Sequence, residues 1–455
     1  MDRAADPEVL SSGLVENEES FVATEIEPGL TLRCLPVKRW KTASITVVFR
    51  VPMKRETVTK LGLVPRLAAR GTRELPSLTE MARFLDGHYG TKLHSNASKI
   101  GYCQILNFSV SFPTPSAIDA GSRGRWLVKE LLSFVWSCAV QPRLSGDGYP
   151  PDVFAHEREE QRRDIEAIVN SRPEYAMVRL MEVLSHGDPS GLPAWGSLSD
   201  LDEVGPVDTW EAWRNSASSS PVDVYVVGVD EDILAAACSA HDWTFPALRN
   251  YRLEPEVKKR PPAVPEKMIS VEDELPGSQT IVCIALYAGI DAANPRFPAL
   301  LAYNGILGGF PHSKLFTEVR ERASLAYFAD TVINSWRGMV IATAGVQDER
   351  RKQAEDLILQ QARSIALGQV SEDELEKTRK GLLRRLMSQK DSPSSLVRRS
   401  LDWIVLGGPR TDEELARMLL KVTREDVIEV AQDVKPVAVY VLRAVPNSAA
   451  GRDAS

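Results

Sequence analysis

The stretch at residues 305–328, GILGGFPHSKLFTEVRERASLAYF, decides how the rest of the chain is interpreted. Its glycines and proline at 308–311 predict a turn, and apolar residues then recur at helical spacing, which predicts a short helix with one buried face. The aromatic and β-branched residues of 325–333 predict a strand immediately after that helix. Arg320 and Tyr327 are therefore expected on either side of a helix-to-strand corner.

This arrangement resembles the C-terminal half of the insulinase/pitrilysin and mitochondrial-processing-peptidase family of zinc peptidases. Tyr327 follows Arg320 after seven residues, and the resemblance implies that both side chains bind the substrate peptide at a zinc site built elsewhere. A guanidinium and a phenol are donors that can hold a peptide carbonyl or stabilise the oxyanion formed when it is attacked. Taken alone, a solvated helix arginine and a half-buried strand tyrosine would be the better explanation of both residues. The surrounding Gly-Gly-x-x-x-Ser-x-Leu-Phe and Leu-Ala-Tyr pattern is what favours the substrate-binding interpretation.

Composition indicates a soluble globular protein of several domains. The 455 residues are 43% hydrophobic and 26% charged, and 55 basic against 62 acidic residues give a net charge of −7, which is not typical of nucleic-acid binding. No apolar run approaches the roughly 18 to 20 residues that a membrane span needs. The five cysteines are widely spaced and odd in number, which predicts reduced thiols in a cytoplasmic protein.

The two ends of the chain are expected to lie outside the folded domains. Residues 1–22 contain six acidic residues and one arginine. A mitochondrial presequence is rich in arginine and a secretory signal has an apolar core, so this segment fits neither. Residues 1–24 are predicted to be a disordered acidic extension, and residues 446–455 a disordered tail.

The order of strands and helices expected over residues 25–243 recurs over 277–445. Both halves end with a helix and an apolar strand that contains Val-Tyr-Val, at 224–226 and 439–441. Residues 244–276 between them hold six prolines among many charges and predict an inter-domain linker. The sequence therefore predicts an α+β protein of two homologous domains, each a largely antiparallel sheet covered by helices. The resemblance, which extends over nearly the whole chain after residue 25, implies the same fold.

The zinc motif that the resemblance leads one to expect is degenerate. Active members of the family carry His-x-x-Glu-His on the first helix of the first domain, where two imidazoles and a downstream carboxylate hold zinc and the glutamate acts as general base. The matching stretch 62–72 reads GLVPRLAARGT, with Pro65 and Ala69 at the histidine positions and Ala68 at the glutamate position. Sliding the alignment does not restore the motif, because the first histidine of the chain is His88. The chain is therefore expected to hold neither metal nor cofactor.

The downstream helix retains carboxylates that could correspond to the third zinc ligand. Asp164 and Glu160 are the best counterparts, within the charged stretch 154–164. Without the histidines, these carboxylates are interpreted as part of a solvated helix face. The six histidines of the chain include no pair spaced by four residues on a helix, so they indicate no alternative zinc site.

The resemblance implies a non-catalytic subunit of a metallopeptidase-like heterodimer that is inactive alone. Zinc-less members of the family occur as one half of a pair whose other chain carries zinc, and the substrate peptide lies between them, often as an additional strand on a sheet edge. Arg320 and Tyr327 would then bind peptide at the zinc site of the partner. Among bacterial members, the likeness is greatest to the zinc-less type associated with 5-aminopentanol modification of elongation factor P.

Two alternatives remain open at the level of sequence. The chain could be a structural or scaffolding protein, or a pseudo-peptidase associated with protein modification, in which Arg320 and Tyr327 are relics. It could also be a metallopeptidase that uses unrecognised ligands, for which the dispersed histidines give little support. The sequence identifies neither the substrate nor the partner, and leaves homodimerisation undecided.

Overall fold

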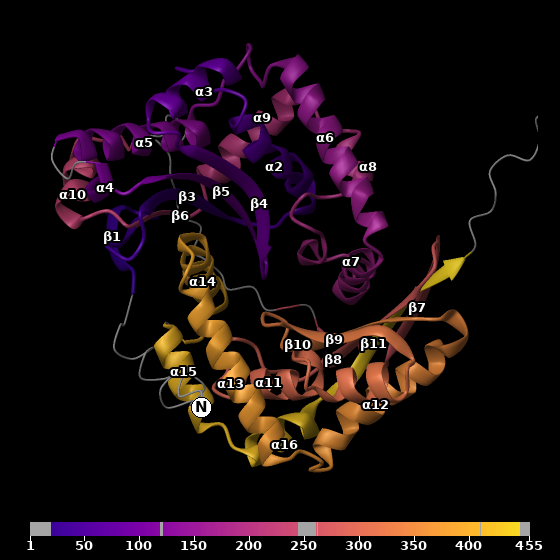
Figure 1. The fold of residues 1–455 in the computed structure, drawn as a ribbon. Coiled ribbons are helices and arrows are strands. Elements are labelled where there is room, and N and C mark those ends of the chain that lie inside the picture. Colours follow the sequence, from indigo (N-terminus) through magenta and orange to yellow (C-terminus); the bar gives the residue numbers. More distant parts are fainter. Residues whose placement is uncertain (1–19, 119–121, 244–260, 262, 410, 446–455) are drawn as a thin grey trace, which may run out of the picture. The chain divides into compact units, whose positions relative to one another are not determined.

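The computed structural model describes residues 20–118, 122–243, 261, 263–409 and 411–445 (Figure 1). The chain divides into two compact units, each built around its own β-sheet. The N-terminal unit holds the described residues of 19–167 and 192–260, and the C-terminal unit holds those of 168–191 and 261–455.

The N-terminal unit is built on a six-stranded sheet. Its strands lie in the order β1 (Val22–Glu27), β2 (Leu30–Leu35), β6 (Val222–Val227), β3 (Thr42–Pro52), β5 (Cys103–Pro113) and β4 (Lys92–Ile100). Strands β2 and β6 run parallel, and the other neighbours run antiparallel. Its described helices are α2 (Arg55–Ala68), α3 (Leu78–Gly87), α4 (Pro115–Ile118), α5 (Ser122–Val140), α6 (Pro151–Asn170), α8 (Leu198–Leu201), α9 (Pro206–Ala217) and α10 (Glu231–Ser239).

The C-terminal unit is built on a five-stranded sheet. Its strands lie in the order β7 (Ile269–Pro276), β11 (Lys435–Val445), β8 (Thr280–Tyr287), β10 (Met339–Val346) and β9 (Ala326–Asn334). Two π-helical segments, η4 (Gly305–Gly309) and η5 (Leu315–Arg322), precede β9. The other described helices are α7 (Arg172–Ser185), η2 (Pro189–Gly191), α11 (Phe297–Asn304), η6 (Asp348–Arg350), α12 (Arg351–Ala366), α13 (Glu372–Gln389), α14 (Pro393–Leu406), α15 (Asp412–Lys421) and α16 (Arg424–Asp433).

The two sheets repeat one topology. Apart from strand β1, the first and last strands of each unit run parallel and adjacent, as β2 with β6 and as β7 with β11. The remaining strands follow in the same order and antiparallel, β6-β3-β5-β4 in one sheet and β11-β8-β10-β9 in the other. The predicted fold of two homologous, largely antiparallel sheets covered by helices is confirmed. Strand β1 is an addition at one edge of the first sheet.

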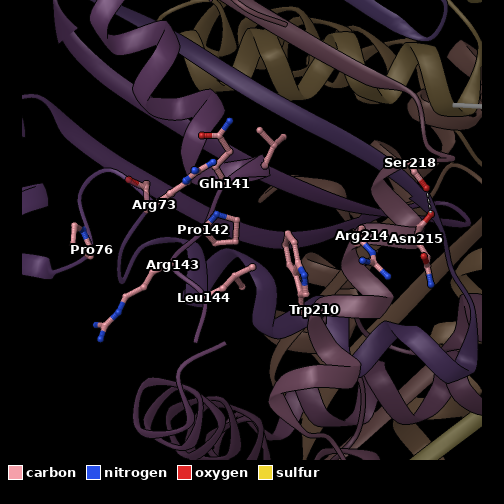
Figure 2. Close-up of a pocket in the computed structure, with 12 residues that line it drawn as sticks. Arg73, Pro76, Gln141, Pro142, Arg143, Leu144, Trp210, Arg214, Asn215 and Ser218 are labelled. Carbon is pink, nitrogen blue, oxygen red and sulfur yellow. Dashed lines mark hydrogen bonds between the residues drawn. The ribbon is translucent and has the colours of Figure 1, made fainter. Parts of the chain in front are cut away.

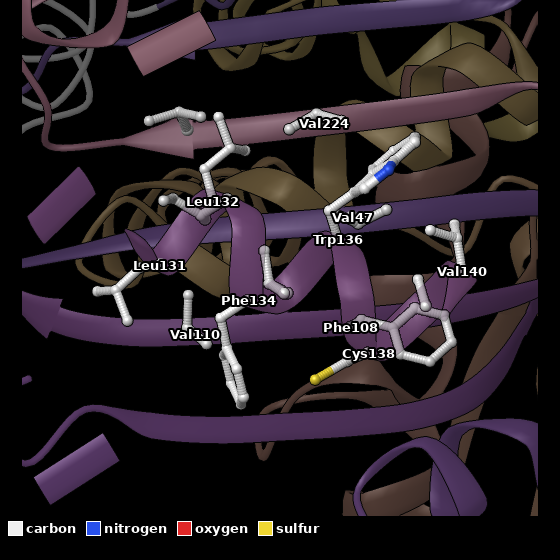
Figure 3. Close-up of a cluster of buried hydrophobic side chains, with 14 of the residues drawn as sticks. Val47, Phe108, Val110, Leu131, Leu132, Phe134, Trp136, Cys138, Val140 and Val224 are labelled. Carbon is white, nitrogen blue, oxygen red and sulfur yellow. The ribbon is translucent and has the colours of Figure 1, made fainter. Parts of the chain in front are cut away.

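The core of the N-terminal unit lies between its sheet and helix α5 (Figure 3). Val47 on β3 is paired with Phe108 on β5 and with Val224 on β6, so three strands present apolar side chains at one level of the sheet. Leu127 and Leu131 of α5 are spaced by four residues and are buried in the same cluster. Burial of each such large side chain stabilises the fold by roughly 1.5–3 kcal/mol.

Helix α7 belongs to the C-terminal unit, although the sequence analysis placed its residues in a first domain over 25–243. Its apolar face, with Leu180 and Leu184, is buried against Cys283 of β8 and Tyr440 of β11. The next residues along β8, such as Ile284, face the opposite side of the sheet and pack with helix α12. The C-terminal sheet is therefore covered on both faces, and its second cover comes from an earlier part of the chain.

Two arginines fix α7 on this sheet. Arg172, at the first turn of α7, donates to the carbonyl oxygens of Gln279 at 2.8 Å and Arg443 at 2.9 Å. Arg337, in the turn between β9 and β10, is buried and donates to the hydroxyl of Ser185 at the last residue of α7, at 2.5 Å. The acceptors of Arg172 are partly buried and that of Arg337 is buried, and an apolar side chain would leave them unpaired.

Two of the three segments expected to be irregular contain a strand in the structure. Strand β1 begins at Val22, inside the extension predicted over 1–24, and residues 1–19 lie outside the described residues. Strand β7 occupies the last eight residues of the linker predicted over 244–276, because it pairs with β11 through backbone groups that a sequence pattern does not reveal. Residues 244–260 and 262 of that linker and the predicted tail 446–455 lie outside the described residues. Within the described part of the chain, no helix has the length and apolar character to cross a membrane.

Candidate functional site

Strand β9 lies directly on the glycine turn that precedes it, in which Gly308 and Gly309 end the π-helical segment η4 and the chain bends from residue 310 onward. A Cβ added to Gly308 would lie 2.6 Å from the Cγ2 atom and 2.9 Å from the backbone nitrogen of Thr331 on β9. The hydroxyl of Thr331 also donates to the carbonyl oxygen of Asn304 at 3.2 Å. Glycine at 308 therefore permits the close contact that holds the turn and the strand together.

Helix η5 presents Arg320 to solvent. Leu315 and Val319 are fully buried and anchor one face of the helix, which leaves Arg320 on the outer face. The guanidinium carbon of Arg320 lies 4.7 Å from the centre of the Phe316 ring, a cation–π contact worth about 0.5–1 kcal/mol at an exposed position. Among the residues that the structure describes, no carboxylate pairs with Arg320, whereas the neighbouring Arg322 pairs with Glu318 at 2.6 Å. The Arg320 guanidinium therefore keeps donors for a ligand.

The chain turns sharply between Arg320 and Tyr327. The η5 helix has the wider i→i+5 pattern, since the backbone nitrogen of Ala323 donates to the oxygen of Glu318 at 3.0 Å. Ser324 then adopts a left-handed conformation with φ of 49°. Short π-helical segments are frequent at functional sites. The predicted helix-to-strand corner is confirmed, and its helix is π rather than α.

Tyr327 lies at an irregularity of an edge strand. Strand β9 is the last strand of its sheet and pairs with β10 alone. The pairing runs from Phe328 opposite Gly345 to Ala326 opposite Val346, so Tyr327 is the additional residue of a β-bulge. Its side chain is 53% exposed. Bulges of this kind redirect a side chain and are common beside active sites.

The stretch predicted to be a degenerate zinc motif lies on helix α2 and at its C-terminal end. Pro65 and Ala68 are buried within the last turns of the helix, and Ala69 is its C-terminal cap. The hydroxyl of Ser95 on β4 donates to the carbonyl oxygen of Pro65 at 2.7 Å. The three positions therefore contribute packing, and none carries a side chain that could bind a metal ion.

The carboxylate that helix α6 buries is Glu157, which the sequence analysis did not single out. Its side chain is 3% exposed, and its oxygen lies 2.5 Å from Nε of Arg70, just beyond the end of α2. The expected counterparts are more exposed, at 64% for Asp164, which pairs with Arg66, and 37% for Glu160, which pairs with Arg163. The helical spacing of Phe154, Glu157 and Gln161, all buried, was the signal available in the sequence.

The residues on α2 and α6 do not fit a zinc ion. Structural and catalytic zinc sites use at least three imidazole, thiolate or carboxylate ligands. Within the described ranges, no group of three or more such side chains could hold a metal ion. The guanidiniums of Arg66 and Arg70 instead pair with Asp164 and Glu157 of α6. Their positive charge opposes binding of a divalent cation.

Two of the histidines, His88 and His312, pack against aromatic rings. His88 caps the end of α3, where its ring stacks on Phe84 with 3.9 Å between ring centres. His312 stacks on Phe310, and its Nε2 lies 3.1 Å from the hydroxyl of Thr378. These contacts give no support to a zinc site with unrecognised ligands.

Residues 218–382 match the family model described as the peptidase M16 inactive domain. Over 420 residues the chain is 26% identical to a probable inactive metalloprotease, YmfF, of Bacillus subtilis (strain 168), a match that covers 91% of this chain and 96% of that protein. It is also 26% identical over 152 residues to an uncharacterized zinc protease, YmxG, of the same bacterium, covering 33% of this chain and 37% of that protein.

The fold has a close counterpart among solved structures. The crystal structure of a conserved protein from Enterococcus faecalis V583 superposes with a TM-score of 0.84 at 22% identity, covering 94% of this chain and all of that one. Likeness at this level of identity establishes the fold alone, so the function has to be argued from the residues of the site.

Proposed function

Because residues 218–382 match the peptidase M16 inactive-domain model, we propose that this chain is a non-catalytic subunit that holds peptide for a zinc-bearing homologue. In this proposal the partner supplies the metal and the general base. This chain supplies Arg320 and Tyr327, which bind the peptide beside the scissile bond. The two chains together would form one active peptidase, and each alone would be inactive.

The observation that carries the proposal is the contrast between two sites of the same chain. On α2 and α6, the positions of a zinc site hold apolar residues and Arg–carboxylate pairs. At the η5–β9 corner, an arginine without a carboxylate partner in the described chain and an exposed tyrosine remain available. A chain that had lost both metal binding and peptide binding would be expected to lose the exposed donors as well as the metal ligands.

The mode of peptide binding follows from the edge position of β9. The backbone groups of β9 that do not face β10 can pair with an extended peptide, which is a common way to add a strand to a sheet. Val332 on the same strand is 49% exposed and offers apolar contact to an alternate side chain of the peptide. Arg320 and Tyr327 would then contact carbonyl oxygens of the bound peptide.

The partner we propose is a zinc-bearing homologue. Bacillus subtilis holds two relatives of this chain, one named as a probable inactive metalloprotease and one as a zinc protease. A heterodimer of an inactive and a zinc-bearing subunit requires both kinds of protein in one organism. The link to elongation factor P modification rests on resemblance alone and stays a prediction.

The test is purification of the tagged chain from its native source in mild salt, followed by mass spectrometry, metal analysis and peptidase assay. We expect an M16 homologue at equal stoichiometry, one zinc ion per pair, and peptide hydrolysis by the pair. The isolated chain should hold no zinc and cleave no peptide. Stoichiometric zinc and hydrolysis in the isolated chain would contradict the proposal, and recovery of the chain without a homologue would favour a scaffolding role.

A further inference from the structure

The N-terminal unit contains a cavity of about 810 Å³ that the proposed function does not use. It lies between the loop that follows α2, the loop that follows α5 and the end of helix α9 (Figure 2). Its size falls within the range of sites for small organic ligands, roughly 300–1,000 Å³. All its lining residues belong to the N-terminal unit.

Backbone hydrogen bonds fix the two loops that form the walls. The nitrogen of Arg73 donates to the oxygen of Gln141 at 2.9 Å, and the nitrogen of Arg143 donates to the oxygen of Gly71 at 2.9 Å. An antiparallel bridge joins Thr72 to Pro142 between these bonds. The cavity is therefore largely preformed, and a ligand would not have to order its walls.

The centre of the cavity is apolar. Trp210 of helix α9 presents its indole there, and an edge-on contact with Tyr149, with 5.9 Å between ring centres, limits its rotation. Pro142 and Leu144 complete this surface. A rigid indole beside aliphatic side chains favours a flat ring of the ligand.

The charge around this apolar centre is positive and uncompensated. Arg73, Arg143 and Arg214 line the cavity, and none of its lining residues is acidic. Figure 2 shows Arg73 and Arg143 to one side of Trp210 and Arg214 to the other. Within the described chain none of the three pairs with a carboxylate, whereas Arg66, three residues before Ala69, does so.

We propose that this cavity binds a small organic anion in which a flat ring is joined to a multiply charged group. The guanidiniums would bind phosphate or carboxylate oxygens, for which their fixed fork of donors is suited. The indole would stack on the ring, and Gln141 and Asn215 would offer neutral hydrogen bonds. Nucleoside polyphosphates and ring-bearing polycarboxylates share this chemistry.

Calorimetric titration of the full chain tests the site and distinguishes the two classes of ligand, nucleoside polyphosphates and ring-bearing polycarboxylates. ATP represents the nucleoside polyphosphates and folic acid the ring-bearing dicarboxylates. We expect at least one of them to bind with a Kd below about 1 mM and about 10-fold more tightly than tripolyphosphate, glutamate or adenosine, which each lack one half of the chemistry.

Substitutions place the binding in this cavity. Arg73→Gln and Arg214→Gln should each weaken the bound probe about 10-fold, since each removes one charge-assisted contact. Arg384→Gln, on α13 of the C-terminal unit, removes the same charge from an exposed position and should leave the affinity unchanged. Unchanged melting temperatures would verify that the variants fold.

Three results would overturn the proposal. The first is that neither ATP nor folic acid binds at 1 mM, the second that tripolyphosphate binds as tightly as ATP, and the third that Arg384→Gln weakens binding as much as Arg214→Gln. Because these titrations use the isolated chain and no peptide, their outcome is independent of the proposed peptidase role.

Discussion

The Nε atom of Arg70 lies 2.5 Å from a carboxylate oxygen of Glu157, and this pair joins the end of helix α2 to the buried face of helix α6. It lies beside the positions at which the resemblance to zinc peptidases predicts metal ligands. A guanidinium can satisfy a buried carboxylate as a metal ion would, since both bring positive charge and fixed geometry. The N-terminal unit is therefore expected to fold and stay folded without metal.

Removal of this guanidinium should destabilise the protein. Arg70→Ala leaves the Glu157 carboxylate buried without its counter-charge, and we expect the free energy of unfolding to fall by about 2 kcal/mol. Arg66→Ala is the matched control, because its partner Asp164 is mostly exposed and the change should cost less than about 1 kcal/mol. Urea unfolding followed by circular dichroism measures both. Equal losses for the two variants would contradict the account of Glu157.

The contact between the glycine turn and β9 makes a second prediction. Gly308→Ala places a methyl group against the backbone of Thr331 and should lower the free energy of unfolding by about 2 kcal/mol. Gly87→Ala, at the end of α3, meets nothing within 4 Å and should leave stability unchanged or raise it by up to about 1 kcal/mol. Thermal unfolding of both variants tests this, and a neutral Gly308→Ala would show that β9 does not depend on the turn.

Acid should destabilise the protein through His241. Burial lowers the pKa of His241 to about 4 and outweighs the nearby carboxylate of Asp242, which favours protonation. Its Nδ1 lies 3.2 Å from the hydroxyl of Ser133, and its ring packs edge-on against Trp136 and Trp243. Between pH 6.5 and 4 the unfolded chain therefore binds a proton that the folded chain does not, so stability falls as the pH falls.

The size of this effect is limited by the partial exposure of the histidine. We expect a loss of about 1 kcal/mol between pH 7 and pH 5, below the limit of about 1.4 kcal/mol per pH unit. His241→Phe keeps an aromatic ring between the tryptophans and should remove this part of the pH dependence. The urea midpoints of unfolding of both proteins at pH 7 and pH 5 provide the measurement. If the midpoint of His241→Phe fell between these pH values as much as that of the unchanged protein, the role of His241 would be contradicted.

Local signals explain why most helices could be predicted from sequence. Ser371 accepts a hydrogen bond from the Glu374 nitrogen at 3.2 Å, and the Glu374 carboxylate accepts one from the Ser371 nitrogen at 2.8 Å. This is a capping box, which the residue types Ser and Glu at a spacing of three predict. The repeat of the two halves followed from the order of such local elements. These signals lie within a few residues, so a single sequence reveals them.

Features that depend on distant partners could not be predicted in this way. Strand β7 is recognised only by its pairing with β11, some 170 residues later, and the position of α7 depends on the face it covers. The buried pair of Arg70 and Glu157 likewise depends on two helices that lie far apart in sequence. For the candidate site, sequence predicted the corner that carries Arg320 and Tyr327, and missed the bulge and the π-helix, because both arise from hydrogen bonds of the folded chain.

The most direct test of the central claim is the rate of peptide hydrolysis by the purified pair when this chain carries Arg320→Ala. We expect kcat/KM to fall about 10- to 100-fold, since a charge-assisted hydrogen bond to the peptide is lost while the zinc content of the pair stays the same. Arg322→Ala, two residues along the same helix and paired with Glu318, should leave kcat/KM unchanged. Full activity of the Arg320→Ala pair would contradict the claim and identify the chain as a scaffold.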